Sequence, residues 1–359
     1  MEWQRDLTVG LERVGDALAS QGDLAGALAA FRESLTATRG LAAKDPGNTQ
    51  WQRDVAVSLN KVGYVLSDQG DFKGALAAFQ EGLSIDRTLA AKDPNNTDWQ
   101  SDVSSALDAV GDVQMALGDQ TGALAAYRES LDIGRVLAAK NAGNTFWQRG
   151  ISVSLNKIGD TLTAQGDREH ALAAYREGLD VMRGLAAKEP GNVQWQRDLA
   201  VSLDRVGDTL AAMGDQTGAL AACTESLKIR REIAAKDPTN LDLQNDISLS
   251  LVRIGNVELE LGNLPEALKS YQATLDIAEP LAKANPDNTE WQYNLVLSYG
   301  KMFAAYYRLG DRDKALDALR LGQPIIERLT KLAPENEAWK QEFEWYQTRI
   351  KNLTQQSQQ

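Results

Sequence analysis

The chain contains 359 residues, of which 43% are hydrophobic and 25% are charged, so it is long enough to bury a sizeable core and has the balance of a globular protein. Its 50 acidic residues against 38 Lys and Arg residues give a formal net charge of -12, which disfavours nucleic acid and anionic membranes as partners. A single Cys and a single His exclude a disulfide framework and the usual multi-histidine metal sites.

A tryptophan grid with a step of 48 residues runs through the chain. It is made of Trp3, Trp51, Trp99, Trp147, Trp195, Trp291 and Trp339, with Leu243 at the missing point. A Gly-Asp dipeptide interrupts each unit near its middle, first at Gly22-Asp23 and with Gly262-Asn263 as the variant. The unbroken register predicts one domain over residues 1–359, built from units 3–50, 51–98, 99–146, 147–194, 195–242, 243–290 and 291–338.

Both halves of a unit have the apolar spacing of an amphipathic helix. In the second unit, Trp51, Val55 and Leu59 step by four residues, as do Phe79 and Leu83. Each unit is therefore predicted to be a helical hairpin whose helices are about 19 to 21 residues, or roughly 30 Å, long.

The predicted helix boundaries have physical causes. Thr49 with Gln52 forms a capping box that would begin the first helix, Gly70 can adopt the left-handed conformation after it, and Asp71 can cap the second helix. Pro94 then prevents continuation. The same signals recur as Thr97, Thr145 and Thr289 and as Pro46, Pro190, Pro238, Pro286 and Pro334.

The two ends of the chain differ from its middle. In the seventh unit, Phe303 replaces the glycine of the first helix and Leu319 replaces the aromatic residue of the second. Residues 339–353 are predicted to form a capping helix, followed by a frayed tail over 354–359. At the other end no cap precedes the first unit, which predicts either a fragment of a longer protein or a first helix that is partly exposed.

A lone hairpin cannot bury its apolar face, so the units are expected to stack into an all-α solenoid. The pattern Leu59-x-x-Val62-Gly63-x-x-Leu66-x-x-x-Gly70-Asp71-x-x-x-Ala75-Leu76-x-x-Phe79-x-x-x-Leu83 resembles the tetratricopeptide repeat, in which a small residue on one helix meets an aromatic residue on the next. Units of 48 residues instead of 34 make it similar to the long-helix variant found in kinesin-light-chain-like arrays.

The resemblance carries expectations for fold and function. It implies a right-handed superhelix of seven helix-turn-helix repeats with a carboxyl-terminal capping helix, whose first helices line a concave face. It further implies a non-enzymatic scaffold for protein-protein interaction that binds a peptide or protein segment on that face. Since such arrays are often fused to effector domains, it also suggests the sensor or adaptor arm of a larger signalling protein.

The binding candidates are polar residues on the first helices, which the resemblance places on the concave face. They are Arg13, Asp16, Asn60, Lys61, Tyr64, Asp108, Asp112, Asn156, Lys157, Asp160, Asp204, Arg205 and Asp208. Stacking would place equivalent residues side by side, in rows that could hold a peptide through charge-assisted hydrogen bonds, and the acidic balance favours a basic or mixed-charge peptide. The alternative is that Lys157 with Asp160, and likewise Arg205 with Asp208, form ion pairs within one helix.

Other residues that can carry chemistry have simpler explanations. The Trp grid is expected to be core. Cys223, at an aromatic grid position, is expected to be a small buried hydrophobe, and His170 is expected to be exposed in the first turn of a second helix. Asp112, Asp160 and Asp208 would chelate a cation only if stacking brought them together, so no metal, cofactor or catalytic residue is predicted. The absence of an export signal or an apolar run near 18 residues predicts a cytoplasmic protein with no membrane partner.

Two other functions stay open. Near-identical units with uncapped ends could associate end to end, which would make the chain a self-assembling module. Alternatively, Asp160 and Asp208 could act as the acid and base of a hydrolase built on a helical toroid. The near-identity of the first five units argues against the hydrolase, because chemistry needs one asymmetric site.

Overall fold

The computed structural model describes residues 2–356, and this part of the chain contains fifteen α-helices and no strand. The helices are α1 (Glu2–Ser20), α2 (Leu24–Lys44), α3 (Thr49–Asp68), α4 (Phe72–Lys92), α5 (Thr97–Ala116), α6 (Gln120–Lys140), α7 (Thr145–Ala164), α8 (Arg168–Lys188), α9 (Val193–Ala212), α10 (Gln216–Ala234), α11 (Leu241–Glu260), α12 (Leu264–Ala284), α13 (Thr289–Leu309), α14 (Arg312–Leu332) and α15 (Glu337–Gln356).

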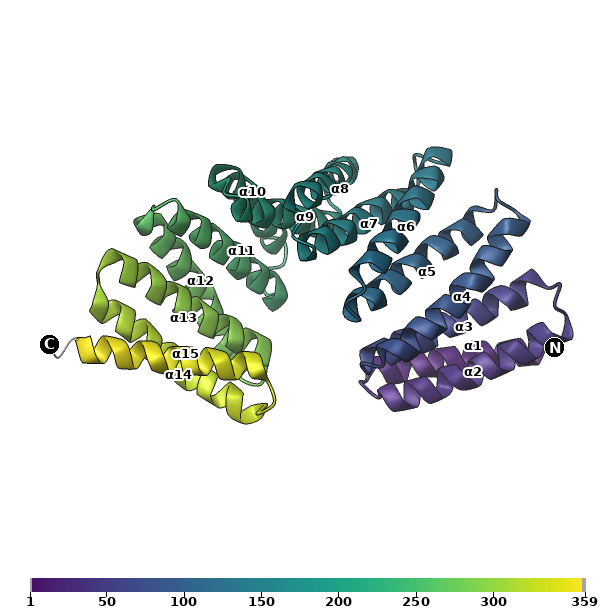
Figure 1. Cartoon of the computed structure of the whole chain (residues 1–359), viewed down its shortest axis with the longest axis horizontal. Helices are drawn as coiled ribbons and strands as arrows, with labels where there is room; N and C mark the ends of the chain where they lie inside the picture. Colours follow the sequence, from purple (N-terminus) through teal and green to yellow (C-terminus); the bar gives the residue numbers. More distant parts are fainter. Residues whose placement is uncertain (1, 357–359) are drawn as a thin grey trace. The chain divides into compact units, whose positions relative to one another are not determined.

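The first fourteen helices form seven hairpins, one for each 48-residue unit (Figure 1). We call the first helix of each hairpin its A helix and the second its B helix. The chain divides into two compact units, residues 1–181 and 182–359, and the division falls inside α8. Successive helices pack against each other from α1 to α7 in the first unit and from α9 to α15 in the second. The prediction of an all-α repeat solenoid is confirmed.

A glycine on the A helix meets an aromatic ring on the B helix in most repeats. A Cβ atom at Gly63 would lie 2.7 Å from the ring of Phe79, so only glycine allows the two helices to approach this closely. In the seventh repeat the bulk is exchanged between the helices, because Phe303 on α13 and Leu319 on α14 are both buried. The core thus keeps its volume when the pair is reversed.

The turns between helices follow the predicted pattern, with one correction. Gly70 has a φ of 79°, and the Asp71 side chain accepts a hydrogen bond from the backbone N–H of Gly74. The cap of the A helix, however, is Asn48 and not Thr49: its side chain accepts from the N–H groups of the second and third helical residues at 3.1 and 3.2 Å. The backbone of Asn48 is extended, whereas Thr49 is already helical, so Asn48 occupies the capping position.

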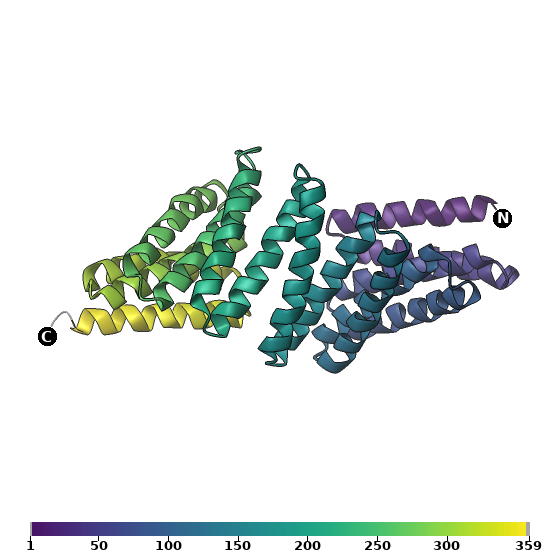
Figure 2. The ribbon, with the colours of Figure 1, turned by 90° about the horizontal axis from the view of Figure 1, so that it is seen from above.

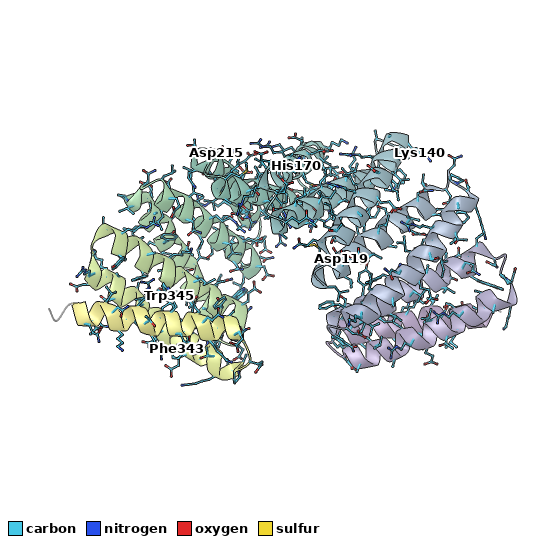
Figure 3. The ribbon with its side chains drawn as sticks, in the orientation of Figure 1. Asp119, Lys140, His170, Asp215, Phe343 and Trp345 are labelled. Carbon is cyan, nitrogen blue, oxygen red and sulfur yellow. The ribbon has the colours of Figure 1, made fainter. Side chains whose placement is uncertain are left out.

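The tryptophan grid lies in or against the core. Trp195 and Trp291 are buried, and Trp51, Trp99, Trp147 and Trp339 are half-buried; the surroundings of Trp3 lie outside the described part. Cys223 is buried as predicted, and burial raises the pKa of its thiol to about 12. His170 is exposed as predicted, with Nδ1 2.8 Å from Asp167 Oδ2 (Figure 3).

The last helix packs against α14 (Figure 2). Tyr346 of α15 is fully buried and donates a hydrogen bond to the Val296 carbonyl at 2.6 Å, while Trp345 meets the ring of Phe303 edge-on. The helix runs three residues into the predicted tail, and residues 357–359 lie outside the described part. At the other end, Leu7 and Val14 of α1 are exposed, whereas Val55 and Val62 at the same grid positions are buried. None of the described helices combines the length and apolar character needed to cross a bilayer.

Candidate functional site

A ladder of ion pairs joins consecutive A helices, and we call it the Asp–Lys/Arg ladder. In each rung an aspartate meets a cation 45 residues later: Asp16 with Lys61 at 2.5 Å, Asp112 with Lys157 at 2.6 Å, and Asp208 with Arg253 at 3.1 Å. Lys157 and Asp208 therefore pair between repeats and not only within one helix. The charges predicted to hold a peptide are largely neutralised by each other.

Aromatic residues of the B helices support this ladder. The Tyr127 hydroxyl donates to Asp112 at 2.7 Å, and the Lys157 ammonium lies 5.3 Å from the centre of the same ring. Tyr175 donates to Asp160 in the same way, at 2.6 Å. Burial and the hydrogen bond to Asp112 raise the pKa of Tyr127, so this hydroxyl stays a donor.

The Asp–Lys/Arg ladder is interrupted between the second and third repeats. Tyr64 stands at the aspartate position of α3, and Ala109 stands at the cation position of α5. The Tyr64 side chain is 53% exposed and its ring packs edge-on against Phe79 at 5.0 Å. Partial burial and the carboxylate of Asp112 raise the pKa of Tyr64. An exposed aromatic ring thus replaces one ion pair.

A second ladder, the Arg–Asp ladder, also joins A helices. Arg53 donates to both carboxylate oxygens of Asp102, at 2.6 and 3.0 Å, and Arg197 lies 3.1 Å from Asp246. Between the third and fourth repeats both partners are absent together, because Ser101 stands at the arginine position and Gly150 at the aspartate position. Helix α5 therefore lacks the cation of both A-helix ladders.

A third ladder, the Arg–Glu ladder, lies on the B helices. Its rungs are Arg39 with Glu81, Arg87 with Glu129, Arg135 with Glu177 and Arg183 with Glu225, at 2.5 to 2.8 Å. All four rungs are well exposed, and exposed pairs of this kind contribute roughly 0 to 1 kcal/mol each. Through the second, third and fourth repeats this ladder is kept, while the two A-helix ladders are interrupted.

Asp108 lies where the ladders are interrupted. Its Oδ1 atom is buried and makes no hydrogen bond. Burial raises the pKa of Asp108 to about 6, although Lys157 and the hydroxyls of Ser130 and Ser154 limit the rise. At neutral pH this carboxylate is ionised and poorly compensated, which is an unfavourable arrangement for an isolated chain.

A partly enclosed pocket of about 130 Å³ opens beside Asp108, and it has room for several water molecules. We call it the α5–α7 pocket. Helix α5 contributes four of its residues, α6 three and α7 five: Ser101, Ser104, Ser105, Asp108, Ser130, Gly134, Leu137, Phe146, Trp147, Arg149, Gly150 and Val153. Phe146, at its edge, is 68% exposed.

The second compact unit has a different arrangement at the equivalent place. The guanidinium of Arg230 lies 2.6 Å from Asp204 and 3.4 Å from Asp246, and Arg253 approaches Asp204 at 3.5 Å. Burial raises the pKa of Asp204, and the charges of Arg230 and Arg253 oppose the rise. This carboxylate is therefore compensated from within the chain.

The remaining predicted residues also lie on A helices. Arg13 is exposed on α1, Arg205 is half-buried with interactions of its own, and the Oδ1 atoms of Asn60 and Asn156 are buried without a partner. Within residues 2–356, no group of three or more His, Cys, Asp or Glu residues could hold a metal ion. Sequence reasoning missed the pocket residues, although the paired departures Tyr64/Ala109 and Ser101/Gly150 are visible on the 48-residue grid.

Part of the chain matches a known repeat in sequence. The tetratricopeptide repeat model matches residues 55–90 and 152–185, in the hairpins α3–α4 and α7–α8. None of the curated proteins matches the chain in sequence.

Several solved structures have a similar fold. BtubC (BKLC) from P. vanneervenii is 17% identical, with 72% of this chain and 91% of that one covered and a TM-score of 0.55. The apo form of RapI is 10% identical, with 92% and 82% covered and a TM-score of 0.55. A putative kinesin light chain from Podosopora anserina with nearly identical TPR-like repeats is 14% identical, with 67% and 100% covered and a TM-score of 0.49.

The hairpins, their glycine–aromatic contacts and the likeness to BtubC and RapI define an α-solenoid repeat protein. Two hairpins of the chain match the tetratricopeptide repeat model, and the fold of that repeat generally serves as a scaffold for protein-protein interaction.

Proposed function

We propose that this protein is a non-enzymatic scaffold that binds an extended peptide or protein segment along its A helices. The observation that carries the proposal is the coincidence of both ladder interruptions on α5. Repetition alone would preserve the ion pairs, since the Arg–Glu ladder on the B helices is preserved through the same repeats. Loss of the A-helix ion pairs in repeats that keep the B-helix ion pairs supports contact between these A helices and a partner.

The chemistry of the interrupted region suits a basic or mixed-charge segment. Tyr64 and Phe146 are exposed aromatic side chains, the type that anchors many protein interfaces. Asp108 supplies a buried carboxylate, and the cation that acts on it, Lys157, is already paired with Asp112. A partner with a cationic side chain would compensate this charge and cover the rings.

The paired charges support a binding role over a hydrolytic one. Asp208 lies 3.1 Å from Arg253, and Asp160 accepts a hydrogen bond from the Tyr175 hydroxyl at 2.6 Å, so each carboxylate already has a partner within the array. The proposed scaffold uses these residues to join repeats.

A peptide-display selection against the folded protein tests the proposal. The discriminating variant carries Tyr64→Asp, Ala109→Lys, Ser101→Arg and Gly150→Asp, which restores both ladders with the residues found in neighbouring repeats. We expect the parent to enrich peptides with basic residues, and the variant to bind them at least tenfold more weakly with unchanged helicity by circular dichroism.

The matched control is the pair Arg87→Ala and Glu129→Ala, which removes one rung on the B helices. We expect it to bind the selected peptides like the parent. The proposal fails if no peptide is enriched, or if the B-helix control loses binding while the ladder-restored variant keeps it.

Self-association is a second candidate, favoured by the exposed Leu7 and Val14 on α1. Sedimentation velocity over a concentration series tests it. The mass should rise with concentration for the parent and stay at that of the monomer for the variant Leu7→Gln with Val14→Gln. A constant monomer mass for the parent would eliminate this function.

A further inference from the structure

We propose that the α5–α7 pocket is a subsite for an arginine side chain of the bound segment. The inference rests on the proposed function, because it names the chemistry of one position on the same surface. Two observations carry it: an equivalent site inside this chain that holds an arginine, and the residues that line the pocket beside Asp108.

The second compact unit contains the equivalent site. Positions 108, 134 and 150 correspond, two repeats later, to Asp204, Arg230 and Asp246. There the Arg230 guanidinium donates to Asp204 Oδ2 at 2.6 Å and to the carbonyl of Asp246 at 3.1 Å, and its side chain is 8% exposed. The same backbone framework therefore encloses a guanidinium beside this carboxylate.

In the α5–α7 pocket the carboxylate is kept and the guanidinium is missing. Gly134 stands where Arg230 would, and Gly150 stands where Asp246 would. The two glycines remove the internal cation and its second anchor, which accounts for the space beside Asp108. An arginine from outside would restore the pairing that the chain satisfies internally elsewhere.

The wall of the pocket suits a guanidinium on an aliphatic stem. Leu137, Trp147 and Val153 provide apolar surface for the methylene groups. The Ser104 and Ser105 hydroxyls can accept hydrogen bonds, and the exposed ring of Phe146 offers a face on which a planar cation can stack.

Arginine fits better than lysine. A guanidinium presents five donors in a plane and sheds water more easily than an ammonium group, so it can reach a carboxylate and several hydroxyls at once. Arg149 also lines the pocket, but it is engaged in an interaction of its own and leaves the Asp108 Oδ1 atom without a hydrogen bond.

The test uses a probe that needs no knowledge of the partner. N-acetyl-L-arginine N-methylamide is titrated into the isotope-labelled full chain, and the backbone amide signals of Gly134 and Gly150 are followed by NMR. We expect saturable shifts at both amides in the millimolar range. The citrulline analogue, which has the same shape without the charge, should bind at least tenfold more weakly, and the lysine analogue should be intermediate.

Two variants locate the effect. Gly134→Arg places a guanidinium in the pocket from inside, as Arg230 does in the second unit, and Asp108→Asn removes the charge; both should abolish the saturable shifts. Asp132→Asn, an exposed carboxylate on α6, is the control and should bind like the parent.

The outcomes separate this inference from the proposed function. If arginine and citrulline probes shift the signals equally, or if Gly134→Arg binds like the parent, the arginine subsite is refuted. If the probe fails while selected peptides still bind along the A helices, the scaffold stands and the subsite falls. If the probe binds but no peptide is ever selected, the subsite stands and the scaffold function fails.

Discussion

The surroundings of Asp108 and Asp204 show how one position in a repeat can be used in two ways. Both aspartates stand at the same point of an A helix, and burial raises the pKa of each. In the second unit Arg230 fills the adjacent space and compensates the charge, whereas in the first unit Gly134 leaves a pocket.

The difference teaches that a buried charge in a repeat array is not by itself evidence of a site. Asp204 is buried more completely than Asp108, yet its partners lie on α10 and α11 of the same chain. What distinguishes Asp108 is the loss of one of these partners, because Gly134 stands where Arg230 would, whereas Lys157 stands at the position of Arg253.

The largest effect is expected from breaking the compensated site. Arg230→Ala would leave Asp204 buried without its nearest cation, which should lower the free energy of unfolding by about 3 to 5 kcal/mol. Urea denaturation measures this loss. Adding Asp204→Ala removes the isolated charge and should recover part of it. A loss under about 1 kcal/mol for the single variant would show that Arg253 compensates the carboxylate alone.

At neutral pH, Asp108→Asn should raise the free energy of unfolding. Because the folded-state pKa is about 6 and the ordinary value is 3.8, ionisation costs the folded state stability. The stability that protonated Asp108 provides is fully present below pH 4 and is lost as the pH rises through 6. It amounts to about 3 kcal/mol at 1.36 kcal/mol per pKa unit.

The parent should therefore fall in stability over this pH window relative to Asp108→Asn, and the two should converge near pH 4. Thermal unfolding as a function of pH measures the difference, with Asp132→Asn as the exposed control. A constant difference between parent and Asp108→Asn across pH 4 to 8 would contradict the environment assigned to Asp108.

A smaller gain in the free energy of unfolding is expected when Gly134 is replaced by arginine, the residue at the equivalent position of the second unit. A Cβ atom at Gly134 would lie 3.4 Å from Ile151, an ordinary contact, so Gly134→Arg is sterically allowed. Replacing a helix-interior glycine adds about 1 kcal/mol through helix propensity, and pairing with Asp108 should add more. Gly40→Arg, an open position on α2, measures the propensity alone. The stability that Gly134→Arg gains beyond this control should vanish when Asp108→Asn is also present.

The smallest change in the free energy of unfolding is expected for the Arg–Glu ladder, which has rungs in both compact units. Arg87 and Glu129 are 50% and 46% exposed, so a double-mutant cycle at this rung should give a coupling below about 1 kcal/mol. The coupling should shrink further in high salt. A coupling energy near the loss expected for Arg230→Ala would mean that solvent exposure does not determine which ion pairs are strong.

The helices and turns were predictable from the sequence because their causes are local. Gly70 and Asp71 act within a few residues, and the periodic apolar positions need only the helix itself. The cap at Asn48 was missed by one residue, since Asn and Thr are both good caps and Thr49 with Gln52 matches a capping box. Only the backbone angles show which residue is the last outside the helix.

The ion pairs were not predictable from the helix alone. Lys157 and Asp160 are three residues apart and face the same way, which makes a pair within α7 the obvious expectation. Stacking places Asp112 of the preceding repeat 2.6 Å from Lys157. The binding role of the predicted groove residues stays a prediction, while the space beside Asp108 emerges only when three helices meet.

The 48-residue grid by itself determined the repeat fold, the hairpins and which residues are equivalent, because periodic spacing and turn chemistry are properties of short segments. Tertiary structure alone decided which charged side chains form ion pairs and which do not. Those contacts join residues 16 to 49 positions apart, and their geometry depends on how one hairpin packs on the next.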